Sequence, residues 1–353
     1  MAHNLARRLD GTYMALYVGQ PAWTSVGVVL DKLQTPEQIQ RKVFDRRVIE
    51  AFPAYAKIGK KVVEVPEFRA IGDKAAGKVF SFASEEYVPI QDIDALRVAG
   101  QIVKSNRKAI FASAGLLGNG ARGFASIDLT RVLGADALAI TGDPSAQEAF
   151  LFADWAHDGS GSVKYGRWRN RVDCNNMLDA ANAAAGKSGR LARILHRGGA
   201  DSMADQVREA ERVLGFTVAD MKLNTKLLNE LAAISLPKPD QWFADFTEKL
   251  VPIPDDMERK STREQTRDLL RDLWSGSKTL QTVPKTPYRG LQVVTEYADH
   301  FRPLRISEAN AASVPEKRFR SIVEGPAADM KAFALELIRQ EFEIGQKVPV
   351  KAR

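Results

Sequence analysis

The chain has 353 residues, of which 44% are hydrophobic and 27% are charged, a composition typical of a globular protein. Its 51 lysines and arginines exceed its 44 aspartates and glutamates, and the net charge of +7 permits a polyanionic partner without requiring one. The single cysteine excludes an internal disulfide and any multi-cysteine zinc site. With no leader pattern and no apolar run of about 18 residues, we expect a cytoplasmic protein that does not enter membranes.

Residues 1–59 are predicted to form an N-terminal segment and a helix. The segment is rich in aromatic residues and is able to pack either on its own domain or on a neighbouring subunit. Thr35 followed by Pro36 is a typical helix start. Apolar residues at helical spacing predict that this helix continues to about residue 51.

Residues 60–215 are predicted to form an α+β core, an antiparallel sheet of successive hairpins packed by a helix. Glycine-containing turns separate the two arms of each of the first two hairpins. We expect a helix over residues 92–104 between these hairpins and a short strand over residues 137–141 after them. The hairpin arms are residues 62–69 with 78–82, and residues 109–117 with 121–129.

The segment around which we expect the core to be organised is a third hairpin followed by a helix. Its arms are residues 150–157 and 163–172, and the loop between them contains two glycines. Asp173 stands where a helix N-cap belongs, and Gly186 stands where that helix would end. The predicted unit is therefore β-β-α.

One side of the second arm of this hairpin carries a row of arginines. Strand alternation places Tyr165, Arg167, Arg169 and Arg171 on the same side, with successive arginines roughly 6.6 Å apart. Such a row is able to follow successive phosphates while the tyrosine stacks on a base. The alternative is a solvated strand face that only keeps the sheet soluble. The candidate nucleic-acid-binding residues are Lys164, Tyr165, Arg167, Arg169, Arg171 and Arg122.

Residues 216–353 are predicted to form a helical C-terminal region with a basic tail. The helical pattern begins shortly before this region. The expected helices cover residues 200–214, 218–234, 241–250, 256–274, 290–300 and 327–342.

No set of residues makes a convincing catalytic site, and we expect no enzyme, no cofactor and no metal. Cys174 with His157 or His196 resembles a nucleophile and base, but Cys174 lies on the apolar face of its predicted helix. Asp154, Asp158 and Asp173 are candidate ligands for a divalent cation, although turn formation and helix capping explain the last two.

Several short motifs occur along the chain, from the first residues to about residue 300. They are MAHN at residues 1–4, MALYVGQPAW at 14–23, HDGS at 157–160, RVDCNN at 171–176, HRGG at 196–199 and VTEYADH at 294–300. These motifs resemble, in the same order, those of a family of uncharacterised proteins carried by phages and plasmids. One departure follows Trp23, where the family often continues with His-Gly and this chain has Thr24-Ser25.

The resemblance implies a role in mobile genetic elements, and the expected core is also similar to that of single-strand annealing proteins. It therefore implies a single-stranded DNA-binding protein that anneals complementary strands, assembled as a homo-oligomeric ring or filament in a bacterial host and working with a partner nuclease. Annealing breaks no covalent bond, which agrees with the lack of a catalytic site. The alternatives are a host-interaction or regulatory protein of a mobile element and a metal-dependent nuclease.

Overall fold

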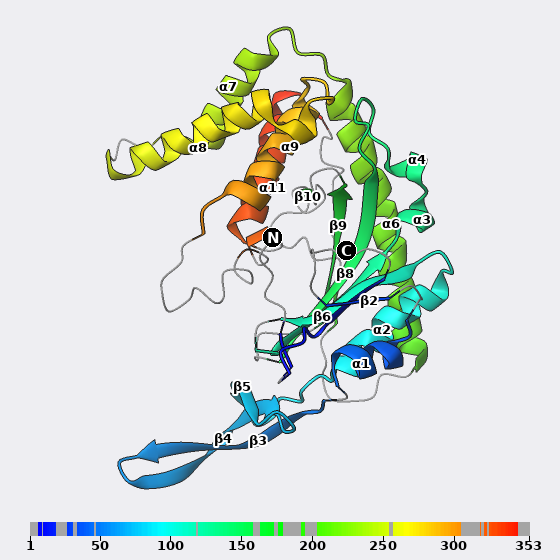
Figure 1. Ribbon diagram of the computed structural model, residues 1–353, viewed down its shortest axis with the longest axis vertical. Coiled ribbons are helices and arrows are strands. Elements are labelled where there is room, and N and C mark those ends of the chain that lie inside the picture. Colours follow the sequence, from blue (N-terminus) through cyan, green and yellow to red (C-terminus); the bar gives the residue numbers. More distant parts are fainter. Residues whose placement is uncertain are drawn as a thin grey trace, which may run out of the picture.

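A computed structural model provides the structure of the chain (Figure 1). It describes residues 6–8, 10–18, 27–30, 34–45, 47–117, 119–157, 163–172, 176–178, 192–194, 203–253, 257–304, 318, 321–322 and 325–344. In these residues the fold is α+β, with antiparallel sheets and a helical C-terminal region, as the sequence predicts. None of the helices described is long and apolar enough to cross a membrane.

The main sheet has eight strands in the order β10-β9-β8-β7-β6-β1-β2, with β11 paired to β9. Neighbouring strands are antiparallel except for β1 and β2, which are parallel. The strands are β1 (Ala15–Val18), β2 (Val28–Leu30), β6 (Ile110–Leu117), β7 (Arg122–Asp128), β8 (Gln147–Ala156), β9 (Val163–Arg171), β10 (Asn176–Leu178) and β11 (Ala192–Ile194).

One face of this sheet packs against α1 (Pro36–Val43), α2 (Asp92–Ser105) and the first part of α6 (Met203–Ala233) (Figure 1). On β8 the alternate residues Ala149, Leu151, Ala153 and Trp155 are fully buried against these helices. The period of two matches the pleat of a strand, so one side of β8 faces a helix layer. Two short helices, α3 (Thr130–Leu133) and α4 (Ala135–Leu138), connect β7 to the turn before β8.

The C-terminal helices form a second hydrophobic core, and α6 belongs to both cores. Met221 of α6 packs in the core beneath the sheet, whereas Leu228 and Leu231 pack among the C-terminal helices. A single helix thereby links the two parts of the molecule. The C-terminal elements are α7 (Pro239–Leu250), α8 (Met257–Gly276), the 3-10 helix η2 (Lys278–Leu280), α9 (Pro287–Glu296), the π-helix η3 (Tyr297–Phe301) and α11 (Pro326–Glu341).

A second sheet projects from the body as an arm (Figure 1). It consists of β3 (Ile49–Ile58), β4 (Lys61–Asp73) and β5 (Lys78–Ser84), in that order. Near the body the arm has three strands, whereas beyond the register shift after Pro53 only β3 and β4 continue as a two-stranded hairpin. We refer to residues 49–86 as the β-arm.

A buried carboxylate anchors the base of the β-arm to the body. Asp92, at the start of α2, accepts two hydrogen bonds from Arg47 (2.6 and 3.2 Å) and one from the indole of Trp155 (2.6 Å). His157 Nε2 lies 2.9 Å from the same carboxylate, and the His157 ring stacks on Phe80 of β5. Gly123 leaves room for the Trp155 ring beside Asp92, because a Cβ at residue 123 would lie 2.3 Å from that ring.

Most of the predicted elements occur at the expected places, and the exceptions have physical reasons. The helix expected to reach residue 51 ends at Val43, because residues from Ile49 onward pair with β4. The strand expected at residues 137–141 is wrong: α4 ends at Leu138, and Ile140 makes only an isolated bridge to Asp143. The two helices expected at residues 200–214 and 218–234 are the single helix α6.

The helix predicted from Asp173 to Gly186 is wrong where the structure describes it. Residues Asn176–Leu178 form β10, which pairs with the end of β9. The other residues of that prediction, including Cys174, lie outside the described residues, as do Asp158 and His196. The division at residues 59 and 215 stays a prediction, although α6 continues across the second of these positions.

We expect Asp92→Asn to destabilise the protein by about 3 kcal/mol at neutral pH, because Arg47 would remain buried without a counter-charge. Burial acts to raise the pKa of Asp92, but the Arg47 charge and the His157 contact outweigh it and hold that pKa well below its ordinary value. Since only the unfolded chain binds the proton readily, the stabilisation is present at pH 7. It is lost as the pH falls below about 4.

Urea unfolding of the wild type and Asp92→Asn at pH 7, 4 and 3 measures this effect. We expect the difference between the two free energies of unfolding to shrink by about 1.4 kcal/mol per pH unit at the acidic end. Asp94→Asn is the matched control, since the Asp94 side chain on the same helix is 44% exposed. If the free energies of unfolding of the wild type and Asp92→Asn differ by the same amount at pH 7 and pH 3, Asp92 is not the ionised partner of Arg47.

Candidate functional site

The predicted arginine row exists, but it faces the interior. Tyr165, Arg167, Arg169 and Arg171 share one side of β9, as the alternation predicts, and their exposed fractions are 0%, 6%, 2% and 2%. They point to the face of the sheet that α6 covers, because Arg167 and Arg169 pair with Leu151 and Ala149, which are buried on that face. The expectation that this row is available to phosphates is therefore wrong.

Each of these arginines has partners within the protein. Arg167 forms an ion pair with Asp220 on α6. Arg169 donates hydrogen bonds to Gln147 (3.0 Å), to Thr225 on α6 (3.0 Å) and to the carbonyl oxygen of Leu138. Burial lowers the pKa of Arg169 to about 10, which still leaves the guanidinium charged at neutral pH. Arg167 and Arg169 therefore join the main sheet to α6.

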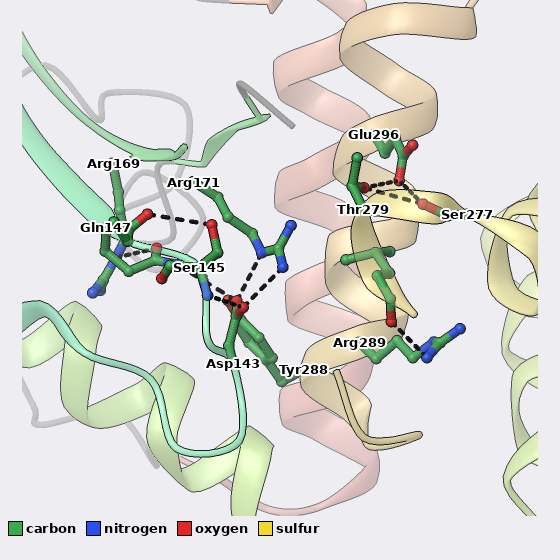
Figure 2. A network of polar contacts seen from close by, with 12 residues as sticks. Asp143, Ser145, Gln147, Arg169, Arg171, Ser277, Thr279, Tyr288, Arg289 and Glu296 are labelled. Atoms are coloured by element: carbon green, nitrogen blue, oxygen red, sulfur yellow. Dashed lines mark hydrogen bonds and ion pairs between the residues drawn. The ribbon is translucent and has the colours of Figure 1, made fainter. Parts of the chain in front are cut away.

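Arg171 lies in a network that connects β9 with the C-terminal helices (Figure 2). It donates two hydrogen bonds to the carboxylate of Asp143, at 2.7 and 2.8 Å, and the hydroxyl of Tyr288 on α9 donates a third at 2.7 Å. Burial acts to raise the pKa of Asp143, but these hydrogen bonds outweigh it and lower the pKa. Burial and the nearby Asp143 charge raise the pKa of Tyr288 well above its ordinary value, so Tyr288 stays a donor.

The remaining candidates of the predicted nucleic-acid site do not join this row. Arg122 on β7 pairs with Ala156, so it points to the opposite face of the sheet, where it forms a 2.8 Å ion pair with Asp154. The Lys164 side chain lies outside the described residues, although its backbone belongs to β9. The six predicted residues therefore do not form one surface.

The structure also bears on the catalytic alternatives. Asp154 is engaged by Arg122, which competes with the cation that the nuclease hypothesis requires. His157 is fully buried against Asp92 and is not available as a general base for a substrate. Within the described part of the chain, no group of three or more His, Cys, Asp or Glu side chains has the geometry to hold a metal ion.

The β-arm carries an exposed aromatic surface that sequence reasoning did not single out. Phe52, Ala70 and Phe82 lie opposite one another across β3, β4 and β5, and therefore share one face of the small sheet. Phe68 lies two residues before Ala70 on the same face. The exposed fractions of Phe68 and Phe82 are 48% and 61%. We call these three phenylalanines, Phe52, Phe68 and Phe82, the aromatic face.

Two exposed lysines, Lys74 and Lys78, lie at the turn between β4 and β5, the strands that carry Phe68 and Phe82. Lys74 forms an ion pair of 3.8 Å with Glu50. The strands that carry Phe68 and Phe82 were predicted from the sequence as the hairpin arms 62–69 and 78–82. The exposure of the two rings was not predicted, because it depends on how segments distant in sequence pack.

Comparison with known proteins identifies the family. A family model described as a domain of unknown function, DUF932, matches residues 79–322, which is more than half of the chain. The chain belongs to the DUF932 family. No curated protein and no solved structure matches it. The DUF932 match includes β9 and its partners, whereas β3 and β4 of the β-arm precede it.

In this DUF932 chain we expect Arg171→Ala to lower the free energy of unfolding by about 3–5 kcal/mol, because Asp143 would lose its buried counter-charge. Thermal and urea unfolding measure the loss. Lys226→Ala on α6 is the control, since the Lys226 side chain is 77% exposed and its removal should change stability by less than about 1 kcal/mol. An Arg171→Ala variant as stable as the wild type would contradict the buried network.

Proposed function

We propose that the protein binds single-stranded DNA through the aromatic face of the β-arm and anneals complementary strands. The observation that carries this proposal is the pair of half-exposed rings, Phe68 and Phe82, on one open sheet surface with Lys74 and Lys78 at its end. Proteins that hold single strands combine flat rings, on which bases stack, with cations that contact the phosphates. The buried arginines of β9 have no part in it.

The spacing of the rings suits successive bases. Phe68 pairs with Ser84, and Ala70 pairs with Phe82, so the two rings occupy diagonal positions on neighbouring strands. Side chains at such positions are separated by about 7–8 Å, which leaves room for one base on each ring. The rings stack on the faces of the bases, and the lysines contact the phosphates. The base edges then stay free to pair with a complementary strand.

The net charge of +7 supports association with a polyanion, and annealing requires no bond to be broken. The resemblance of the sequence to proteins of phages and plasmids supports a role in the cytoplasm of a bacterial host, where such elements pass through single-stranded stages. A partner nuclease would supply the single strands. The aromatic face, rather than an enzymatic centre, is the site on which this proposal depends.

Fluorescence anisotropy of a labelled single-stranded oligonucleotide tests the proposal. We expect Phe68→Ala combined with Phe82→Ala to weaken binding at least tenfold, because each stacked base contributes about 1–3 kcal/mol. Lys74→Ala combined with Lys78→Ala should weaken binding and reduce the salt dependence, by about 0.7 in the log–log slope for each lost phosphate contact. The rate at which labelled complementary strands anneal should fall in both double variants.

Phe333→Ala is the matched control, because Phe333 on α11 is 48% exposed and lies outside the β-arm. This variant should bind and anneal like the wild type. Wild-type protein that does not bind the oligonucleotide at low salt would overturn the proposed function. Binding that survives both double variants unchanged would overturn the assignment to the aromatic face.

A further inference from the structure

The outer end of the β-arm is positively charged. Lys57, Lys60 and Lys61 lie at the turn between β3 and β4, and all three are exposed. Among the described residues, no carboxylate lies within ion-pair distance of these lysines. We call them the lysine tip.

The middle of the β-arm is negatively charged. Glu64, Glu67, Glu85 and Glu86 are exposed there, and the backbone N–H of Glu85 donates to the carbonyl oxygen of Glu67, which keeps the segments together. Within the described part of the chain, the cation that forms ion pairs with these glutamates is Arg69, which lies 3.7 Å from Glu64 and 3.0 Å from Glu85. We call these four glutamates the acidic segment. Residues 49–86 contain six basic and six acidic side chains, so the β-arm as a whole is neutral.

Exposed apolar side chains lie on both faces of the outer hairpin. Tyr55 and Val62 share one face, because Tyr55 pairs with Glu64 and Val62 pairs with Lys57, whereas Ile58 and Val63 point to the other face. The exposed fractions of Tyr55, Val62, Ile58 and Val63 are 59%, 68%, 68% and 45%. A two-stranded hairpin is marginally stable on its own, and contiguous exposed apolar side chains generally mark an interaction surface. The outer hairpin is therefore a candidate surface for a partner that covers apolar side chains and complements both charge groups.

We propose that this partner is a second copy of the chain, whose β-arm packs antiparallel against the first about a two-fold axis. The axis passes near Val62, so that Tyr55 and Val62, which share one face of the hairpin, meet the same side chains of the second copy. The lysine tip of each copy then faces the acidic segment of its partner. About seven residues of β4 separate the β3–β4 turn from Glu67, which is roughly 23 Å at 3.3 Å per residue. This distance is the length over which the two arms overlap.

Charge complementarity favours a second copy over other occupants. In a two-fold interface the same surface serves both copies, so the patch must be complementary to itself, and a basic tip beside an acidic segment meets that condition. A nucleic acid would be attracted by the lysine tip but repelled by the acidic segment. Pairing of two arms also places lysines of the partner next to the carboxylates that border the aromatic face.

Reciprocal charge reversal tests this interface without DNA, so its outcome does not depend on the proposed function. The first variant combines Lys57→Glu, Lys60→Glu and Lys61→Glu, and the second combines Glu64→Lys, Glu67→Lys and Glu86→Lys. Light scattering coupled to size-exclusion chromatography should give twice the 38.9 kDa chain mass for the wild type and the single-chain mass for each variant alone. An equimolar mixture of the two variants should recover the doubled mass, because both contacts become attractive again.

A control variant combines Lys222→Glu, Lys238→Glu and Lys278→Glu, three exposed lysines outside the β-arm. It should keep the mass of the wild type. A monomeric wild type would overturn the proposal. An assembly whose mass neither charge-reversal variant changes, or a mixture of the two that stays monomeric, would overturn it as well.

Discussion

Arginine side chains that leave water must be given partners inside the protein, and β9 buries three of them in a row. An uncompensated buried charge costs several kcal/mol, whereas a compensated one ties together the elements that supply its partners. Here the partners come from α6, from the end of α4 and from the turn that carries Asp143. The long helix α6 is thereby held across the sheet. Through Tyr288 the same network reaches α9 and positions the C-terminal helices.

A second buried carboxylate performs the corresponding task at the other end of the molecule. Asp92 gathers Arg47, Trp155 and His157, and Phe80 of the β-arm packs on the His157 ring. The base of the β-arm is fixed in this way, while its outer part projects beyond the body (Figure 1). The two networks leave the exposed rings, lysines and glutamates of the β-arm as the groups best placed to meet a partner. In our proposals, DNA binding and self-association share this element, and a partner's lysines would reduce repulsion between the acidic segment and a bound strand.

The sequence predicted the hairpins well, because alternation and glycine turns are local signals. The pairing of β8 with β9 and the common side of Tyr165 and Arg171 followed from period two alone. The arginines are buried because α6 covers them and supplies Asp220 and Thr225 as partners. These two residues come some fifty residues later in the chain, and no local pattern specifies where α6 packs. Asp143 and Asp92 were missed for the same reason, since their partners are distant in sequence. The exposure of Phe68 and Phe82 likewise depends on the packing of distant segments, and no helix of the described residues covers their side chains.

Hydrogen exchange of the full chain, measured by mass spectrometry with and without a saturating single-stranded oligonucleotide, tests the central claim most directly. The arginines of β9 lie inside the protein, and in our proposal the binding surface is on the β-arm. We therefore expect the oligonucleotide to slow exchange in residues 49–86 and to leave residues 163–171 unchanged. Slower exchange in residues 163–171 without a change in the β-arm would contradict this placement of the binding surface.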